Sequence, residues 1–205
     1  LPRWAIVQCP LVYENLVIVA SQAPEAGVVA YDKMTGEVKW KTPPLGPVGY
    51  VSPALVQVAG EEHVVMITAG EGRRGETPTG GLVVGIAPLT GEVLWEYAGF
   101  QCRIPVPGAF DAGEGKVLII GGYEAGSAMI QVIKQADGGY GVSELFTTKE
   151  FGAHTKPPLS HNGYFYAQYS TNERRDGLVC MSDDGEIMWQ TKRDPTFNKG
   201  SMILA

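Results

Sequence analysis

Side chains that could hold a polar ligand recur at one place in this chain, just before the first apolar segment of each repeated unit. They are cationic, aromatic or amide residues: Arg3, Trp4, Tyr50, Gln101, Arg103, His154 and Lys156. Gathered at the mouth of a channel, such groups would suit an anionic or polar ligand. In the alternative interpretation, they only cap strand ends and line a water-filled channel.

Two pairs of adjacent arginines, each close to acidic residues, form a second candidate surface: Arg73, Arg74, Arg174 and Arg175. Both pairs fall in segments that we expect to be loops, where binding residues are common. One interpretation is a rim that grips an acidic or extended partner. The other is an ordinary solvated loop, because exposed charges contribute little energy.

No catalytic or metal-binding motif is recognisable. GxSxG and HExxH are absent, and the glycine-rich segment 70–75 leads into Glu76-Thr77-Pro78 and not into a helix, so we expect no phosphate loop. The three histidines are too dispersed in the sequence to suggest a metal site: His63, His154 and His161. We therefore predict no catalytic residue and no metal ligand.

Three cysteines lie in or beside predicted strands, and their spacing fits no metal site: Cys9, Cys102 and Cys180. We expect free, buried thiols that behave as small apolar groups. The alternative is one disulfide between two units.

A repeated phrase determines the elements that must position these residues. Residues 30–40 read Ala-Tyr-Asp-Lys-Met-Thr-Gly-Glu-Val-Lys-Trp, and the phrase returns at 85–95 and, shortened, at 179–189. Each copy predicts a strand, a tight turn and a second strand, with glycine where the turn needs a positive φ. The residues that carry the phrase are Asp32, Thr35, Gly36, Trp40, Thr90, Gly91, Trp95, Gly185 and Trp189.

A pair of short apolar strands around a turn precedes each phrase, and in the third unit Phe146 stands at the tryptophan position. Four strands per unit and a period of roughly fifty residues are typical of β-propeller blades. We therefore predict an all-β propeller of four-stranded antiparallel blades. The blades are expected at about 8–41, 51–96, 104–147 and 156–190, with a further blade beginning at 200–205.

In this arrangement the linkers between blades and the loops in the middle of each blade share one face. The expected linkers are 41–50, 97–103, 148–155 and 191–199, and the expected middle loops are 21–27, 70–81, 122–128 and 170–177. This face is where a rigid scaffold would present binding residues.

The segment 30–40 matches the pattern Ala-x-Asp-x-x-Thr-Gly-x-x-x-Trp at every position, and the chain resembles the PQQ-type (pyrroloquinoline quinone repeat) β-propellers over essentially its whole length. The second copy departs from the pattern at Gly85 and Ala87, and the last copy lacks the threonine and one residue. Proteins of this kind are commonly likened to the propeller lipoprotein of the outer-membrane barrel assembly machinery. The resemblance implies a parent with seven or eight blades and an exported, periplasmic or envelope location; a cytoplasmic location is the alternative.

The resemblance also extends to the PQQ-dependent alcohol dehydrogenases. It would lead one to look for an adjacent Cys-Cys pair, a Glu, Asn and Asp set that holds calcium beside the quinone, and a tryptophan under the quinone ring. Here no Cys-Cys pair and no CxxCH haem motif occurs, and Asp32 and Asp183 look like turn residues. We expect no cofactor, with PQQ and calcium as the alternative.

Composition argues against nucleic-acid binding and against a membrane-spanning helix. The net charge is −6 and the basic residues are scattered, which argues against nucleic-acid binding. No apolar stretch approaches the length that a transmembrane helix needs.

The sequence therefore favours a non-catalytic PQQ-like propeller that acts as an envelope binding or assembly scaffold, with a protein or small polar ligand on its loop face. The alternative is part of a PQQ-dependent oxidoreductase whose cofactor ligands lie outside this segment. The remaining blades of the parent propeller are further expected partners. Because an open arc of blades exposes apolar faces, we expect the isolated 205-residue chain to be marginally stable or to self-associate.

Overall fold

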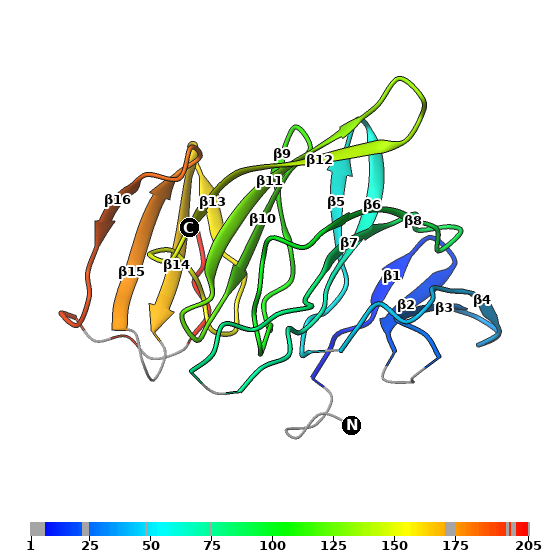
Figure 1. The fold of residues 1–205 in the computed structure, drawn as a ribbon, viewed down its shortest axis with the longest axis horizontal. Helices are drawn as coiled ribbons and strands as arrows, with labels where there is room; N and C mark the ends of the chain where they lie inside the picture. Colours follow the sequence, from blue (N-terminus) through cyan, green and yellow to red (C-terminus); the bar gives the residue numbers. More distant parts are fainter. Residues whose placement is uncertain are drawn as a thin grey trace.

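The computed structural model describes residues 7–21, 25–47, 49–73, 75–170, 175–195, 197 and 200–204. In this part of the chain, sixteen strands form four separate four-stranded antiparallel sheets, each ordered as its strands occur in the sequence. Figure 1 shows the sheets side by side in chain order, from β1–β4 in blue to β13–β16 in yellow and orange. The prediction of an all-β fold with blade-like sheets is confirmed.

Each sheet takes four consecutive strands, and we call the sheets blades 1 to 4. Blades 1 and 2 comprise β1 (Leu11–Tyr13), β2 (Leu16–Ala20), β3 (Val28–Asp32), β4 (Val38–Lys41), β5 (Ala54–Val58), β6 (Glu61–Ile67), β7 (Val83–Ile86) and β8 (Val93–Tyr97). Blades 3 and 4 comprise β9 (Phe110–Gly113), β10 (Lys116–Gly121), β11 (Gly126–Lys134), β12 (Tyr140–Thr148), β13 (Leu159–His161), β14 (Tyr164–Ser170), β15 (Arg175–Ser182) and β16 (Ile187–Gln190).

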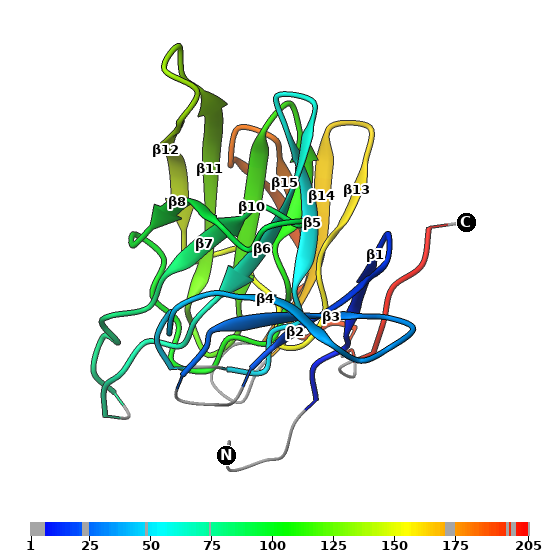
Figure 2. The ribbon, with the colours of Figure 1, turned by 90° about the vertical axis from the view of Figure 1, so that its right-hand side faces the viewer.

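The inner strands of blade 3 are apolar on both faces because this blade lies between blades 2 and 4 (Figure 1; Figure 2 views the row of blades from the side of blade 1). In β10, Val117 and Ile119 belong to the core shared with blades 1 and 2, while Leu118 and Ile120 belong to the core shared with blade 4. The alternation of side chains along a strand thus supplies both cores from one continuous apolar run. The outermost strands are more exposed: β4 and β8 each bury only their tryptophan, and β12 and β16 have no buried residue.

The closing aromatic residues occupy equivalent places in the four blades. Each pairs with the residue of the third strand that immediately precedes a β-bulge: Trp40 with Ala30, Trp95 with Gly85, Phe146 with Met129 and Trp189 with Cys180. A bulge changes the direction of the side chains beside it. The prediction that Phe146 replaces a tryptophan is confirmed by this register.

The turn glycines adopt the predicted backbone conformation. The φ angles are 74° at Gly36 and 75° at Gly91. The turns share a hydrogen bond, from Gly36 N to Asp32 O at 2.9 Å and from Gly91 N to Ala87 O at 2.9 Å. The Asp32 carboxylate also accepts from the amides of the first turn, which lowers its pKa, but the second turn forms with alanine at that place. The carboxylate is therefore not required for the turn.

The ring that closes one blade packs on the glycine turn of the next. At Gly91 a Cβ atom would overlap the ring of Trp40, and at Gly185 it would lie 2.8 Å from the ring of Phe146. Trp40 is buried, and its Nε1 donates a hydrogen bond to Pro88 O at 3.0 Å, within the turn of blade 2. Glycine is needed at Gly91 both for its φ angle and for the space that the ring occupies.

The contact between blades 2 and 3 differs, because blade 3 has a longer hairpin in place of the Thr-Gly turn. Trp95 Nε1 donates to Nδ1 of the buried His63 at 2.9 Å, within blade 2. The His63 ring meets Tyr140 of blade 3 edge to face, with centroids 4.6 Å apart. Glu61 accepts hydrogen bonds from Lys134 and Tyr140 across the same contact.

All three cysteines are free in the structure. Cys102 and Cys180 are buried and free as expected, but Cys9 is also free and is exposed, because it precedes β1 and lies outside the sheet. Residues 200–204 form no strand. The further blade that we expect at 200–205 therefore stays a prediction.

Substitution of the turn glycines separates the backbone requirement from the packing requirement. Gly36→Ala adds a Cβ that meets nothing within 4 Å, so it should cost only the left-handed backbone penalty of about 1–2 kcal/mol. Gly91→Ala carries the same penalty and also displaces Trp40, which should add about 1–3 kcal/mol. Urea denaturation of both variants measures the difference. Equal costs would show that the Trp40 contact contributes nothing.

The buried His63 predicts a loss of stability in mild acid. Burial, the main cause, lowers its pKa, Glu61 opposes this change and Lys134 adds to it. Because the folded state disfavours the charged ring, the unfolded chain takes up the proton first. The contribution of neutral His63 is therefore complete above about pH 6.5 and declines as the pH falls below that value.

We expect Tm to fall between about pH 7.5 and 5.5, and to fall less in His63→Gln, which cannot titrate. Glu61 does not produce this loss, since Lys134 and Tyr140 lower its pKa and its contribution is lost only in stronger acid. Differential scanning calorimetry over this range is the measurement. The same pH dependence in both proteins would assign it to other groups.

Candidate functional site

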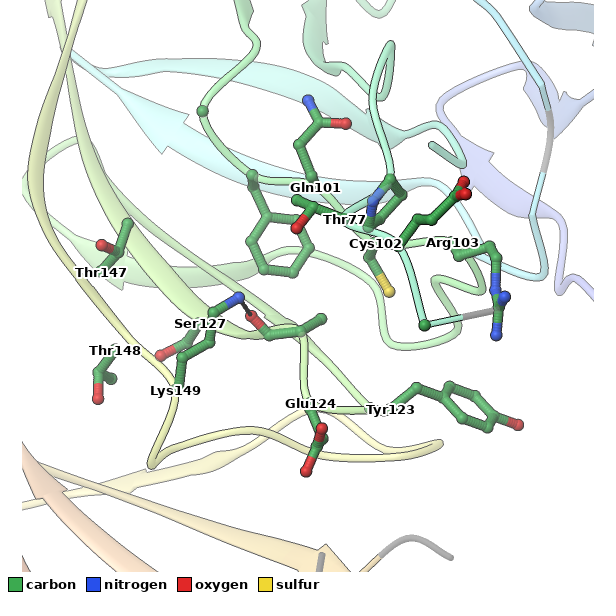
Figure 3. A pocket seen from close by; sticks show the side chains of 17 residues that line it. Thr77, Gln101, Cys102, Arg103, Tyr123, Glu124, Ser127, Thr147, Thr148 and Lys149 are labelled. Atoms are coloured by element: carbon green, nitrogen blue, oxygen red, sulfur yellow. Dashed lines mark hydrogen bonds between the residues drawn. The ribbon is translucent and has the colours of Figure 1, made fainter. Parts of the chain in front are cut away.

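Loops of blades 2 and 3 enclose a cavity of about 680 Å³ (Figure 3). Four segments line it: 75–78, 99–103, 122–127 without Gly126, and 147–149. Segments 75–78 and 122–127 belong to the predicted middle loops 70–81 and 122–128. Segment 99–103 belongs to the predicted linker 97–103, and segment 147–149 overlaps the start of the predicted linker 148–155. The structure thus brings together segments that the sequence placed on one face.

The lining offers both hydrogen-bond donors and acceptors with balanced charge. Glycines expose backbone groups. The polar side chains include two acids, two cations and four hydroxyl groups: Glu76 and Glu124, Arg103 and Lys149, and Thr77, Ser127, Thr147 and Thr148. Phe100 and Pro78 add apolar surface. A surface of this composition can satisfy a ligand that has alternating polar groups and some apolar contact.

Ser127 is the most deeply placed polar side chain of the lining. It is 2% exposed, and its hydroxyl has no hydrogen-bond partner among the described residues. A buried hydroxyl without a partner costs about 1–3 kcal/mol, so a polar group of a ligand that reached Ser127 would recover part of that energy. Close by, Lys149 Nζ donates to Ala125 O at 3.0 Å, which keeps the ammonium group at the cavity.

Gln101 and Cys102 line the cavity but have other tasks. The Gln101 amide bonds to both backbone groups of Gly81 at 2.9 Å and to Ala98 O at 2.8 Å, so its polar atoms hold the loops together. Burial raises the pKa of Cys102 to about 11. The thiol therefore stays protonated near neutral pH and is a poor nucleophile.

The residues that the sequence grouped at a channel mouth do not share one cavity. Gln101 and Arg103 lie in the cavity described above, whereas His154 and Lys156 line a separate hollow of about 10 Å³. Tyr50 lines neither, and its backbone amide donates to Pro105 O at 3.0 Å.

The remaining predicted residues are exposed or not described. Arg73 is exposed. Arg3, Trp4, Arg74 and Arg174 lie outside the described residues, as does the side chain of Arg175, whose backbone begins β15.

The sequence did not point to Ser127, Thr147 or Lys149 as site residues, although Ser127 lies in the predicted middle loop 122–128 and Lys149 in the predicted linker 148–155. Thr147 and Lys149 flank the boundary between the last strand of blade 3 and the predicted linker 148–155, which was a usable signal. The structure differs from the predicted loop at Ser127, because β11 already begins at Gly126 and pairs Ser127 into the sheet. Its role becomes visible only from its burial beside the cavity.

Neither a cluster of metal ligands nor a helix that could span a membrane occurs among the described residues. There, no group of three or more His, Cys, Asp or Glu side chains is placed to hold a metal ion. A calcium-quinone site of the kind that the resemblance implies gathers carboxylate oxygens on the metal, and the described residues do not fit it. Within the same residues there is no helix with the length and apolarity needed to cross a membrane.

Known structures share the fold at low sequence identity. BamB from Moraxella catarrhalis is 14% identical, with a TM-score of 0.47 over 94% of this chain and 63% of that one. The quinohaemoprotein alcohol dehydrogenases of Comamonas testosteroni and Pseudomonas putida are 15% and 16% identical, each with a TM-score of 0.51 over 91% of this chain and 34% of theirs. The chain therefore spans less than two thirds of the length of each.

A comparison with curated proteins finds no match. The family model described as outer membrane protein assembly factor BamB matches residues 3–191. That range includes all four blades and the cavity between blades 2 and 3. The chain therefore belongs to this family of PQQ-like propeller repeat proteins.

Proposed function

We propose that this chain is a non-catalytic scaffold of the cell envelope that binds an extended polypeptide segment of a protein partner. The cavity between blades 2 and 3, with the buried Ser127 hydroxyl at its wall, is the observation that carries the proposal. The family description, an assembly factor of the outer membrane, supports a protein partner and a periplasmic or envelope location.

A polypeptide suits this lining better than a strongly charged small molecule. Its backbone alternates donors and acceptors, and the cavity presents threonine and serine hydroxyls together with exposed glycine backbone. An anion would meet repulsion as well as attraction, because two cations and two acids line the cavity: Arg103, Lys149, Glu76 and Glu124. An extended segment would also bury its apolar side chains against Phe100 and Pro78.

A displayed library of random peptides provides the probe. Peptides selected on the wild-type chain should lose at least about tenfold in affinity for Ser127→Ala, which removes the hydroxyl and adds no atom at this buried position. Ser143→Ala, at an exposed position of β12, is the matched control and should bind as the wild type does. Failure to select any peptide, or equal binding by both variants, would contradict the proposal.

The alternative, part of a PQQ-dependent dehydrogenase, requires cofactor ligands outside this segment. It is tested by titrating the chain with PQQ and calcium and by following alcohol-dependent dye reduction. We expect neither saturable quinone binding nor dye reduction. Stoichiometric binding with dye reduction would favour the oxidoreductase.

A further inference from the structure

The three junctions between blades differ in what the closing ring bonds to. At the junction of blades 1 and 2, the Trp40 indole donates to a backbone carbonyl, Pro88 O, which does not titrate. At the junction of blades 3 and 4, the ring of Phe146 has no polar atom. At the junction of blades 2 and 3, the Trp95 indole donates to Nδ1 of His63, which accepts only while the imidazole is neutral. The ring contact of this junction therefore depends on pH.

The residues around this bond differ from their equivalents in blade 1. A Cβ at Gly85 would overlap the Trp95 ring, so glycine lets the ring lie back over its own blade. His63 takes the place of Leu16, two residues before the second-strand residue that is in line with the closing ring. Tyr140 of the long hairpin in blade 3 then covers the imidazole. A buried ionisable ring thus stands where blade 1 has a buried apolar side chain.

Protonation of His63 removes the acceptor, since Nδ1 then carries a hydrogen that points at the indole N–H. Two donors would face each other inside the core, where His63 is 1% exposed. Its Nε2 is also buried and has no hydrogen-bond partner among the described residues, so nothing there compensates the added charge. Glu61 lies two residues earlier on the same strand and therefore on the same face. The charged ring would move toward that carboxylate and away from Trp95.

Other charged groups at the junction decide the direction of this response. The titratable side chains on the strands around His63 are Glu61 of β6, Tyr97 of β8, Asp111 of β9, Lys134 of β11, and Tyr140 and Glu144 of β12. β5 and β7 carry no ionisable residue. Burial is the largest cause and lowers the pKa of His63, while Glu61 raises it and Lys134 lowers it. The junction is therefore closed at neutral pH and opens in mild acid.

The strands that make this contact continue into the walls of the cavity. β8, which carries Trp95, runs into the lining segment 99–103. β12, which begins at Tyr140, ends in the lining segment 147–149. Partway along both strands, the Tyr97 hydroxyl donates a hydrogen bond to the Glu144 carboxylate and joins β8 to β12. A change in the spacing of these strands at His63 is therefore passed to the cavity.

We propose that the junction between blades 2 and 3 is an acid-sensitive gate for the cavity: protonation of His63 releases Trp95, separates β8 from β12 and lowers the affinity of the cavity for its polypeptide partner. This inference rests on the proposed function, because it names the regulation of the same site. At neutral pH the gate is closed and the partner binds, and in mild acid the partner is released.

Nuclear magnetic resonance of the labelled 205-residue chain follows the gate without a ligand. The Trp95 indole signal, assigned by its absence in Trp95→Phe, should shift between about pH 7.5 and 5.0. The backbone amides of Phe100 and Thr148 should shift with the same midpoint. In His63→Asn, whose amide oxygen can accept the indole bond but does not titrate, these shifts should be lost. His161→Asn, at an exposed position of β13, is the control and should titrate as the wild type does.

Peptides selected at neutral pH, from a library without Asp, Glu and His, then test the effect on binding. Their affinity for the wild type and for His161→Asn should fall at least about tenfold in mild acid, whereas their affinity for His63→Asn should change less than about twofold. Circular dichroism at both pH values should show that each protein stays folded.

Each part of the inference has a result that overturns it. An indole signal that does not move would show that the gate stays closed. A moving indole signal with fixed amides at Phe100 and Thr148 would show that the gate does not reach the cavity. Peptides that bind equally well at both pH values, or that lose as much affinity for His63→Asn, would leave the proposed function intact and remove the gate. If the signals move together but no peptide binds at either pH, the proposed function fails and the inferred regulation fails with it.

Discussion

The contact of an aromatic ring with the glycine turn of the next blade is the constraint on which this structure depends. Trp40 on Gly91 and Phe146 on Gly185 show it most directly. The ring can approach only because the turn has no Cβ, and the turn exists only because glycine accepts a positive φ. The bulge beside each closing residue places the ring, so one short phrase of sequence encodes the strand pair, the turn and the junction between blades.

The junction between blades 2 and 3 departs from this rule, and the candidate site lies between the same two blades. Trp95 bonds to His63 within its own blade, and Glu61, Lys134 and Tyr140 make the contact across the junction. The loops at the cavity are held by Gln101, whose amide ties Gly81 to Ala98. The proposed binding surface thus rests on loops that are joined by hydrogen bonds, as expected for loops that present a ligand site.

The sequence predicts the fold well because the repeat is local. The positions of Trp40, Gly36 and Phe146 follow from the phrase and its spacing, and the expected loop face follows from the order of strands within a blade. The site is less predictable, since it depends on which loops are long enough to meet. His154 and Gln101 stand at similar points in the pattern, yet they line different hollows. The burial of Ser127 depends on packing between segments far apart in sequence, which no local pattern encodes.

The most direct measurement is a double-mutant cycle between Trp40→Ala and Gly91→Ala, with unfolding free energies from urea denaturation. If the ring and the turn form one contact, Gly91→Ala in the Trp40→Ala background should cost only the backbone penalty of about 1–2 kcal/mol, since the ring that the new Cβ displaces is gone. The two substitutions would then be clearly non-additive. Additive costs, with Gly91→Ala equally damaging whether or not Trp40 is present, would contradict the account.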